Sequence, residues 1–447
     1  MTIRTLLTAL LLSGGLVAQT APVADFHRHP PQTWALTHAS LHIDPETTIE
    51  DGLLVIRDGK IAYAGKKTNL PADATEIDLT GRHIYPGFID LYFPVQHKDS
   101  PSASHLRHWN EQVHAEDLAV DDWSPEAAAV QHRREAGFGA GLAVPQEGIF
   151  AGTGGVVLLD EAGTVLRPDL AQVVQFRYGG WSSKQYPNSL LGCIALIRQT
   201  LYDADWYRRA WQIYEKYPDR NPVPETNPAL DRLATARENN RPFLFPTGDE
   251  LAALRAIKIA REFHLRLWLR GSGYEYRRLK EIAAAAPLVI APVNYPAPPD
   301  VSDPYRALQY STEQLKHWDQ APDNLQRMHA AGLLFSITPE GTDSPKTFHQ
   351  NLVRSVERGL APAEALAALT TIPARALGLE NQLGRLRPGA LANLTITDGD
   401  YFQRQTKVET VWIGGKRYRI EEPVPVTLAG RWRLTADAWT GTLSFSG

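Results

Sequence analysis

Residues 34–85 alternate apolar and polar positions in three short runs. The runs read WALTHASLHID, GLLVIRDGKIAYAG and TEIDLTGRHIYPG, and each is bounded by Gly, Asp or Pro. Alternation with a period of two, interrupted by turn residues such as Asp58-Gly59, is typical of short antiparallel strands. The pattern predicts a small β-sheet in this part of the chain.

From residue 86 to 390, apolar strand-like runs alternate with helical segments. This alternation predicts βα units around a parallel sheet, for which a barrel is the natural closure. The expected strands are Gly139–Val144, Phe243–Phe245, Leu265–Leu269, Leu288–Pro292 and Leu333–Ile337. The expected helices include Asp249–Phe263 and Ala361–Leu369, the second with Pro362 in its first turn.

Residues 391–420 return to alternating strands around a turn at Gly414-Gly415. This segment can pair with the first sheet, so we expect one composite β-unit built from both ends of the chain. Residues 421–447 alternate again, as an extra hairpin or as the start of a further β-domain. Residues 202–240 are polar, aromatic and punctuated by proline, and we expect them to form an insertion that covers one mouth of the barrel.

The N-terminus has the layout of a secretory signal, in which Arg4 precedes an apolar run from Leu6 to Val17 that is too short to span a bilayer. We expect residues 1–20 to be a signal peptide and 21–33 a leader. The expected location is periplasmic or secreted, with no membrane span after signal cleavage. The expected fold is α/β: a TIM-like (β/α)8 barrel at 86–390 and a small composite β-sandwich from 34–85 and 391–420.

The composition of the 447 residues is that of a soluble globular protein, with 43% apolar and 21% charged residues. The formal net charge of −4 provides no basic footprint, so nucleic acid is not an expected partner. Cys193 is the single cysteine, so no intramolecular disulfide can form. It lies in the apolar run LLGCIALI, where a thiol is expected to pack rather than react.

Four motifs follow one another at the two ends of the predicted barrel: IYPGFID before it, then LTTIPARALGL, LGRLRPGALANLTITDGD and VETVWIGGKRY after it. In order and spacing, the chain resembles the amidohydrolase superfamily, specifically its imidazolonepropionase-like secreted members, over roughly residues 34–420. The resemblance implies a barrel with a composite β-domain, hydrolysis of carbon–nitrogen bonds, and zinc or another divalent metal at the barrel mouth.

The ligand positions implied by this resemblance carry residues that do not bind metal. The family's His-x-His pair, which follows the Pro-Gly-hydrophobic-Ile-Asp lead-in, matches Tyr92 and Pro94, and a later ligand histidine matches Pro246. The family's catalytic carboxylate on the last barrel strand matches Thr338, although a slip of one or two residues would offer Glu340 or Asp343. With these replacements we expect no metal, no cofactor and no catalytic residue at the mouth.

Other candidate chemistry is weaker. His27 and His29 have ligand spacing but precede the first sheet, and a further group without recurring spacing is expected on exposed loops and helices: His97, His105, His108, His114 and His132. The glycine-rich GTGGVV at 152–157 lacks the lysine of a phosphate loop and is expected to be a turn between strands. The side chains expected at the mouth are aromatic and polar: Tyr92, Phe93, Trp109, Asn110, Tyr274, Tyr276 and Tyr295.

Three functions are compatible with these features. The first is a secreted, catalytically degenerate and metal-free amidohydrolase homologue that acts as the partner of a ligand-complete homologue, in a homo- or hetero-oligomer. The second is an active hydrolase of non-peptide or cyclic-amide carbon–nitrogen bonds with relocated metal ligands. The third is a periplasmic protein that binds a small molecule at the aromatic mouth.

Overall fold

The computed structural model describes residues 33–96, 108–121, 123–124, 127–180, 186–420, 430–436 and 439–445, the last two segments by their backbone alone. The expected signal peptide and nearly all of the leader, with His27 and His29, lie outside the described residues, as do His97 and His105. Among the helices that are described, none has the length and apolar character needed to cross a membrane.

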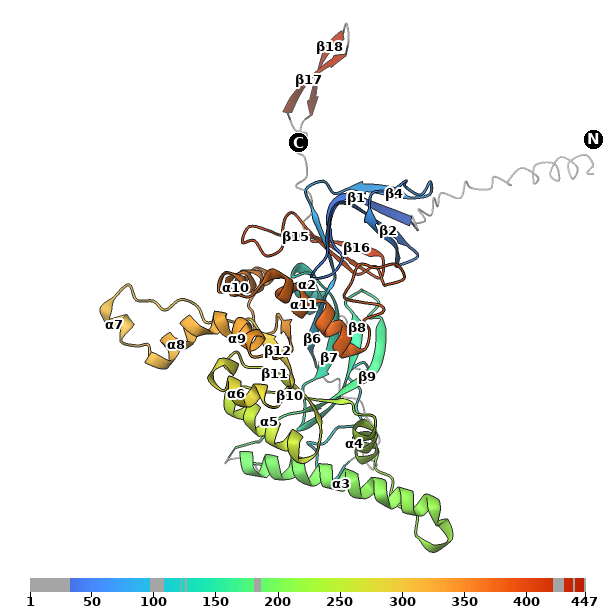
Figure 1. Ribbon diagram of the computed structural model, residues 1–447, viewed down its shortest axis with the longest axis vertical. Helices are drawn as coiled ribbons and strands as arrows, with labels where there is room; N and C mark the ends of the chain where they lie inside the picture. Colours follow the sequence, from blue (N-terminus) through green and yellow to red (C-terminus); the bar gives the residue numbers. More distant parts are fainter. Residues whose placement is uncertain are drawn as a thin grey trace, which may run out of the picture.

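Both ends of the chain contribute strands to one sheet (Figure 1). Its strands are β1 (Thr33–His42), β2 (Thr48–Arg57), β3 (Lys60–Lys66), β4 (Thr75–Asp78), β5 (His83–Pro86), β14 (Leu394–Thr397), β15 (Val408–Ile413) and β16 (Lys416–Arg419). The order is β16-β15-β14-β5-β1-β2-β3, with β4 paired to β1. The two ends join where β5 and β14 pair antiparallel, with Tyr85 opposite Thr395. The predicted composite β-unit is confirmed as this eight-stranded sheet.

A second sheet of eight strands forms the barrel. Its strands are β6 (Phe88–Val95), β7 (Phe138–Pro145), β8 (Phe150–Leu158), β9 (Val165–Val174), β10 (Pro242–Pro246), β11 (Arg266–Arg270), β12 (Leu288–Pro292) and β13 (Phe335–Thr338). They follow one another in chain order from β6 to β13, and β13 also lies against β6, which nearly closes the sheet. The predicted barrel is confirmed, and each of the five strands expected from the sequence overlaps one of its strands.

The barrel departs from regular βα alternation at β7, β8 and β9, which form an antiparallel meander. The GTGGVV segment at 152–157 lies inside β8, so the expected turn is wrong. Its glycines are required by close packing of the strand: a Cβ on Gly155 would lie 2.5 Å from the Pro168 carbonyl oxygen, and one on Gly154 2.8 Å from the Ala143 carbonyl oxygen. Glycine in a strand interior marks such a close backbone approach.

Helices connect and flank the remaining barrel strands (Figure 1). They are α2 (Ala127–Glu135), α3 (Leu190–Lys216), α4 (Pro228–Glu238), α5 (Glu250–Glu262), α6 (Leu279–Ala283), α7 (Pro304–Ala307), α8 (Thr312–Gln320), α9 (Asn324–Ala330), α10 (Pro345–Glu357), α11 (Pro362–Leu369) and α12 (Thr371–Leu377). The two helices expected from apolar spacing correspond to α5 and α11. The Asp249 side chain caps α5 by accepting a hydrogen bond of 2.6 Å from the Ala252 N–H.

The expected insertion at 202–240 is a pair of helices. Its first helix, α3, begins before the insertion, at Leu190, and packs on α4. Arg208 contacts Glu238 at 2.6 Å, and Arg237 contacts Asp205. Because α4 ends just before β10 begins, this pair of helices meets the barrel at the amino-terminal ends of its parallel strands.

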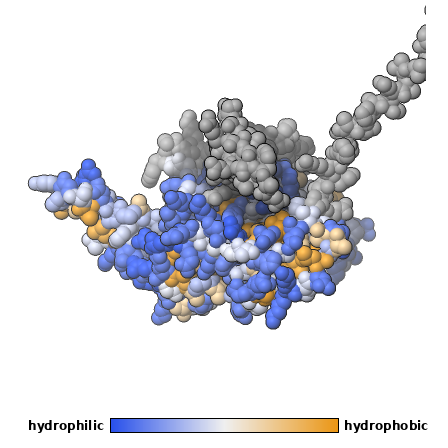
Figure 2. Space-filling model, turned by 90° about the horizontal axis from the view of Figure 1, so that it is seen from above, coloured by the Kyte–Doolittle hydropathy of each residue, from blue (hydrophilic) through white to orange (hydrophobic). Residues whose placement is uncertain are grey.

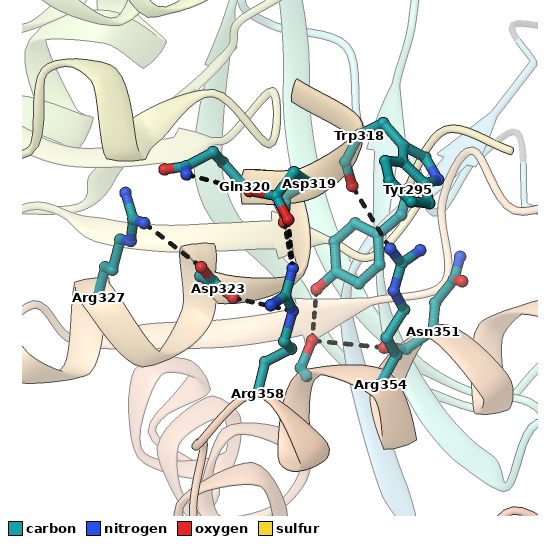
Figure 3. A network of polar contacts seen from close by, with 10 residues as sticks. Tyr295, Trp318, Asp319, Gln320, Asp323, Arg327, Asn351, Arg354 and Arg358 are labelled. Carbon is teal, nitrogen blue, oxygen red and sulfur yellow. Dashed lines mark hydrogen bonds and ion pairs between the residues drawn. The ribbon is translucent and has the colours of Figure 1, made fainter. Parts of the chain in front are cut away.

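Residues 296–320, which we call the arm, project from the body of the protein and contain α7 and α8 (Figures 1 and 2). Polar contacts fix the base of the arm (Figure 3). Arg358, which caps the carboxyl end of α10, donates to Asp319 at 2.8 Å, and its Nε lies 3.3 Å from Asp323. Tyr295, just before the arm, shares a 2.6 Å hydrogen bond with Ser355. The arm is therefore anchored to α10 at both of its ends.

The last described segments, β17 (Gly430–Ala436) and β18 (Trp439–Phe445), pair as an antiparallel hairpin in which Gly430 lies opposite Phe445. A hairpin is expected in either of the two forms considered for residues 421–447, so both remain predictions.

Candidate functional site at the barrel mouth

The four positions implied as ligand or base sites lie on three barrel strands. Tyr92 and Pro94 are in β6, Pro246 ends β10 and Thr338 ends β13. The strand registers place Pro246 opposite Arg270 and Thr338 opposite Pro292, so these positions share the carboxyl end of the parallel strands. The Thr338 hydroxyl also hydrogen-bonds Asp90 and so links β13 to β6. We call this end of the sheet the mouth.

A guanidinium bridges two carboxylates at the mouth. Arg133, in the last turn of α2, donates from Nε to Asp90 Oδ2 at 2.8 Å and from Nη2 to Glu340 Oε2 at 3.2 Å. The other Asp90 oxygen accepts a 2.9 Å hydrogen bond from the backbone N–H of Tyr92. The same guanidinium lies over the Phe93 ring, 4.0 Å from its centroid. Arg133 is therefore held on three sides by hydrogen bonds and by an aromatic face.

Burial dominates the protonation of both carboxylates. Asp90 is fully buried, which raises the pKa of its carboxyl group, and the charge of Arg133 and its hydrogen bonds oppose that shift. Burial also raises the pKa of Glu340; Arg133 again opposes the shift, and the negative charge of Asp90 adds to it. Two carboxylates share one cation here, so each depends on Arg133 to remain ionised inside the protein.

A second guanidinium, that of Arg270, lies beside Tyr92. Its carbon Cζ is 5.5 Å from the centroid of the Tyr92 ring, and its Nε is buried without a hydrogen-bond partner among the described residues. The backbone carbonyl of Arg270 accepts a 2.9 Å hydrogen bond from the Thr247 hydroxyl. Tyr92 in turn donates from its hydroxyl to Gln146 Oε1 at 3.4 Å. The mouth therefore contains two fixed positive charges.

The residues at the mouth do not fit a divalent metal. Tyr92, Pro94, Pro246 and Thr338 present no imidazole and no carboxylate, and the nearest carboxylates are engaged by Arg133. Of the alternatives weighed for the base, Glu340 reaches the mouth and is the one bound to Arg133. Among the described residues, no group of three or more His, Cys, Asp or Glu side chains has an arrangement that could hold a metal ion.

The aromatic and polar residues expected at the mouth do not gather at one place. Phe93 packs edge-on against Trp123 at 5.1 Å, under Arg133. Tyr274 and Tyr276 instead contact His317 of the arm, Tyr274 by stacking at 3.8 Å and Tyr276 through a 3.1 Å hydrogen bond. Tyr295 bonds Ser355 at the base of the arm. These three tyrosines lie just after β11 and β12, and they contact the arm or α10.

Trp109 and Asn110, the other two expected lining residues, lie in the segment before α2. Trp109 is 66% exposed beside His108, whereas Asn110 is buried and donates to the Tyr186 carbonyl at 3.2 Å.

The described histidines of the expected surface group are separate: His108 is buried, His114 lies 3.7 Å from Asp117, and His132 is on α2. Burial lowers the pKa of both His108 and His132. Cys193 is buried in α3, and burial raises the pKa of its thiol to about 11.

Sequence reasoning missed the two arginines of the mouth. Arg270 could have been found, because it directly follows an expected strand, Leu265–Leu269, whose carboxyl end faces the mouth. Arg133 gave no such signal, since it lies in a short polar helix that no motif marked. Its role depends on β6 bringing Asp90 against α2.

An eight-stranded barrel joined to a sheet from both ends of the chain is the architecture of barrel hydrolases of the amidohydrolase type. The sequence profile described as the amidohydrolase family matches residues 198–418. The crystal structure of an amidohydrolase from Thermotoga maritima superimposes with a TM-score of 0.69 at 20% identity, covering 86% of this chain and 99% of that one. The profile match over just under half of the chain, together with the similar fold, supports a place in the amidohydrolase superfamily.

Curated relatives match over short stretches. Imidazolonepropionase of Paracoccus denitrificans is 51% identical over 47 residues, which are 10% of this chain and 12% of the relative. Dihydroorotase of Anaeromyxobacter sp. is 42% identical over 52 residues, 11% of this chain and 12% of the relative. The matches thus span about an eighth of the length of these relatives, and they carry no substrate over to this chain.

Proposed function

We propose that this protein is a secreted, catalytically degenerate and metal-free amidohydrolase homologue that acts as the partner of a ligand-complete amidohydrolase. The observation that carries the proposal is the guanidinium of Arg133 between Asp90 and Glu340. A metal site needs deprotonated donor atoms turned towards the ion. Here the carboxylates are turned towards an arginine, and a second arginine, Arg270, lies beside Tyr92.

The arm supports the role of a partner. Its exposed large apolar side chains include Tyr305 at 80%, Leu308 at 82% and Val301 at 61% exposure. Exposed apolar side chains gathered on a projecting and anchored segment are typical of protein–protein contact surfaces. We propose that the arm contacts the ligand-complete homologue. Export to the periplasm is part of the proposal and is supported by the apolar run that follows Arg4.

Metal analysis tests the first half of the proposal. The full chain is purified without chelators, incubated with excess zinc, desalted and analysed for bound metal, with a zinc-containing amidohydrolase treated in parallel. We expect zinc in the parallel sample and only traces in this protein. Near-stoichiometric zinc in this protein, together with hydrolysis of a cyclic amide, would instead establish the active hydrolase with relocated ligands.

Co-purification tests the second half. The tagged full chain is produced together with a ligand-complete amidohydrolase, and the eluate is examined for a stable complex by size-exclusion chromatography with light scattering. The double variant Tyr305→Ala, Leu308→Ala should lose the complex. The control Leu191→Ala, Val223→Ala removes two other exposed apolar side chains, on α3 and on the loop before α4, and should keep it. A protein that remains monomeric with every such homologue tried would exclude the partner role.

A further inference from the structure

A cavity of about 620 Å³ lies at the opposite end of the barrel from the mouth. Its walls include Arg266, which begins β11, Leu288, which begins β12, and Leu334, which immediately precedes β13. Arg270 and Thr338, at the other ends of β11 and β13, belong to the mouth. Because β11, β12 and β13 run parallel, the length of these strands separates the cavity from the mouth.

The walls of this cavity are basic. Arg261 comes from the last turn of α5, Arg375 from the last turn of α12 and Arg266 from β11, and His264 lies between α5 and β11. No Asp or Glu is among the residues that line it. The rest of the lining is mostly apolar and includes Ile257, Leu267, Trp268, Leu288, Leu334 and Ile372. An apolar floor under several cations is a suitable surface for an amphipathic anion.

The three arginines lack counter-charges. Within the described part of the chain, none of their side chains makes an ion pair or a hydrogen bond, and Arg266 makes only a distant contact with the Trp268 ring, at 5.9 Å. A neighbouring cavity that shares His264 shows the opposite arrangement. There Arg208 is paired with Glu238 and Arg237 with Asp205. The chain thus neutralises one basic cluster internally and leaves the adjacent one without partners.

Helix ends explain only part of this arrangement. A cation in the last turn of a helix interacts favourably with the helix dipole, which accounts for Arg261 and Arg375 taken separately. Arg266 lies in a strand, so a helix dipole does not account for its position. All three arginines are exposed, so water screens their mutual repulsion in part, and an anion between them would remove what remains.

We propose that this cavity binds an organic anion, a carboxylate or phosphate group carried on an apolar body. Guanidinium groups bind both kinds of anion through paired hydrogen bonds, and the apolar floor would hold the attached chain or ring. The volume lies in the range of about 300–1,000 Å³ that is typical of small-molecule sites. The site does not depend on the proposed function, because the mouth contributes no residue to it.

Calorimetric titration of the full chain tests the proposal with four probes: octanoate, octyl phosphate, octanol and inorganic phosphate. We expect both amphipathic anions to bind, with affinities that fall as salt is added, and octanol and inorganic phosphate to bind at least about tenfold more weakly. Binding of only one of the two amphipathic anions would identify the head group as carboxylate or phosphate. Binding of neither anion, or equal binding of octanol, would overturn the proposal.

Two triple variants localise the site. Arg261→Gln, Arg266→Gln, Arg375→Gln should weaken octanoate binding at least about tenfold. The control Arg209→Gln, Arg220→Gln, Arg419→Gln removes the same charge from exposed arginines outside the cavity and should bind as the unchanged protein does. If the first triple variant does not fold, the single variant Arg266→Gln provides the same comparison. Unchanged affinity in the cavity variants would overturn the assignment.

Discussion

The guanidinium of Arg133 and the carboxylate of Asp90 lie 2.8 Å apart in the interior of the protein, where the Asp90 side chain has no exposure to solvent. The pair joins α2 to β6, and Glu340 joins it from the loop that follows β13. The resemblance of this chain to the amidohydrolase superfamily implies a divalent metal at the mouth of the barrel. Here the guanidinium of Arg133 supplies the positive charge beside Asp90 and Glu340.

Replacing Arg133 by Met should destabilise the protein by about 3–5 kcal/mol, because it leaves Asp90 buried without a counter-charge. The measurement is the free energy of unfolding from urea titration. The double variant Arg133→Met, Asp90→Asn should recover part of the loss, since the neutral amide does not need the cation. A loss below about 1 kcal/mol in the single variant would show that the pair is not buried as described.

The effect of Arg133→Met should depend on pH. Burial raises the pKa of Glu340 above its ordinary 4.5, so the folded state holds this proton more tightly than the unfolded state does. The resulting stability is full below the unfolded pKa and is lost as pH rises through the folded pKa. Removing Arg133 raises the folded pKa further. The destabilisation should therefore be small near the ordinary pKa and grow towards neutral pH. Adding Glu340→Gln should weaken this dependence and leave the part that comes from Asp90.

Gly155 should not tolerate a side chain. A Cβ at this position would lie 2.5 Å from both the Pro168 carbonyl oxygen and a methyl group of Val120, so Gly155→Ala should cost about 1–3 kcal/mol in unfolding free energy. Gly248 is the matched control, because a Cβ there meets nothing within 4 Å. Gly248→Ala should be close to neutral. Equal effects of the two substitutions would contradict the close packing of β8.

Cys193 should be unreactive in the folded protein. Burial raises the pKa of its thiol to about 11, so very little thiolate exists at pH 8, and the side chain is enclosed. Titration with a chromogenic disulfide reagent should detect no thiol in the native protein and one after unfolding in urea. Rapid labelling of the native protein would contradict the burial of the amino-terminal part of α3.

The sequence patterns predicted most of the architecture, because periodicity follows from which faces are buried. The composite sheet and the strands from Phe243 to Ile337 are examples. The error at residues 152–157 arose because glycine also serves close strand packing, which only the neighbours of Gly155 reveal. The contact of Arg133 with Glu340 spans 207 positions, and no local pattern encodes it. The stacking of Tyr274 on His317 of the arm was not predicted either, because the two residues are distant in the sequence.

We propose that the mouth holds arginine-bound carboxylates in place of a metal. The most direct measurement is an anomalous difference map at the zinc absorption edge, from crystals of the full chain grown with zinc. We expect no peak among the carboxyl ends of β6, β10 and β13, with Arg133 bound to Asp90 and Glu340. A strong peak there, coordinated by protein side chains, would contradict it.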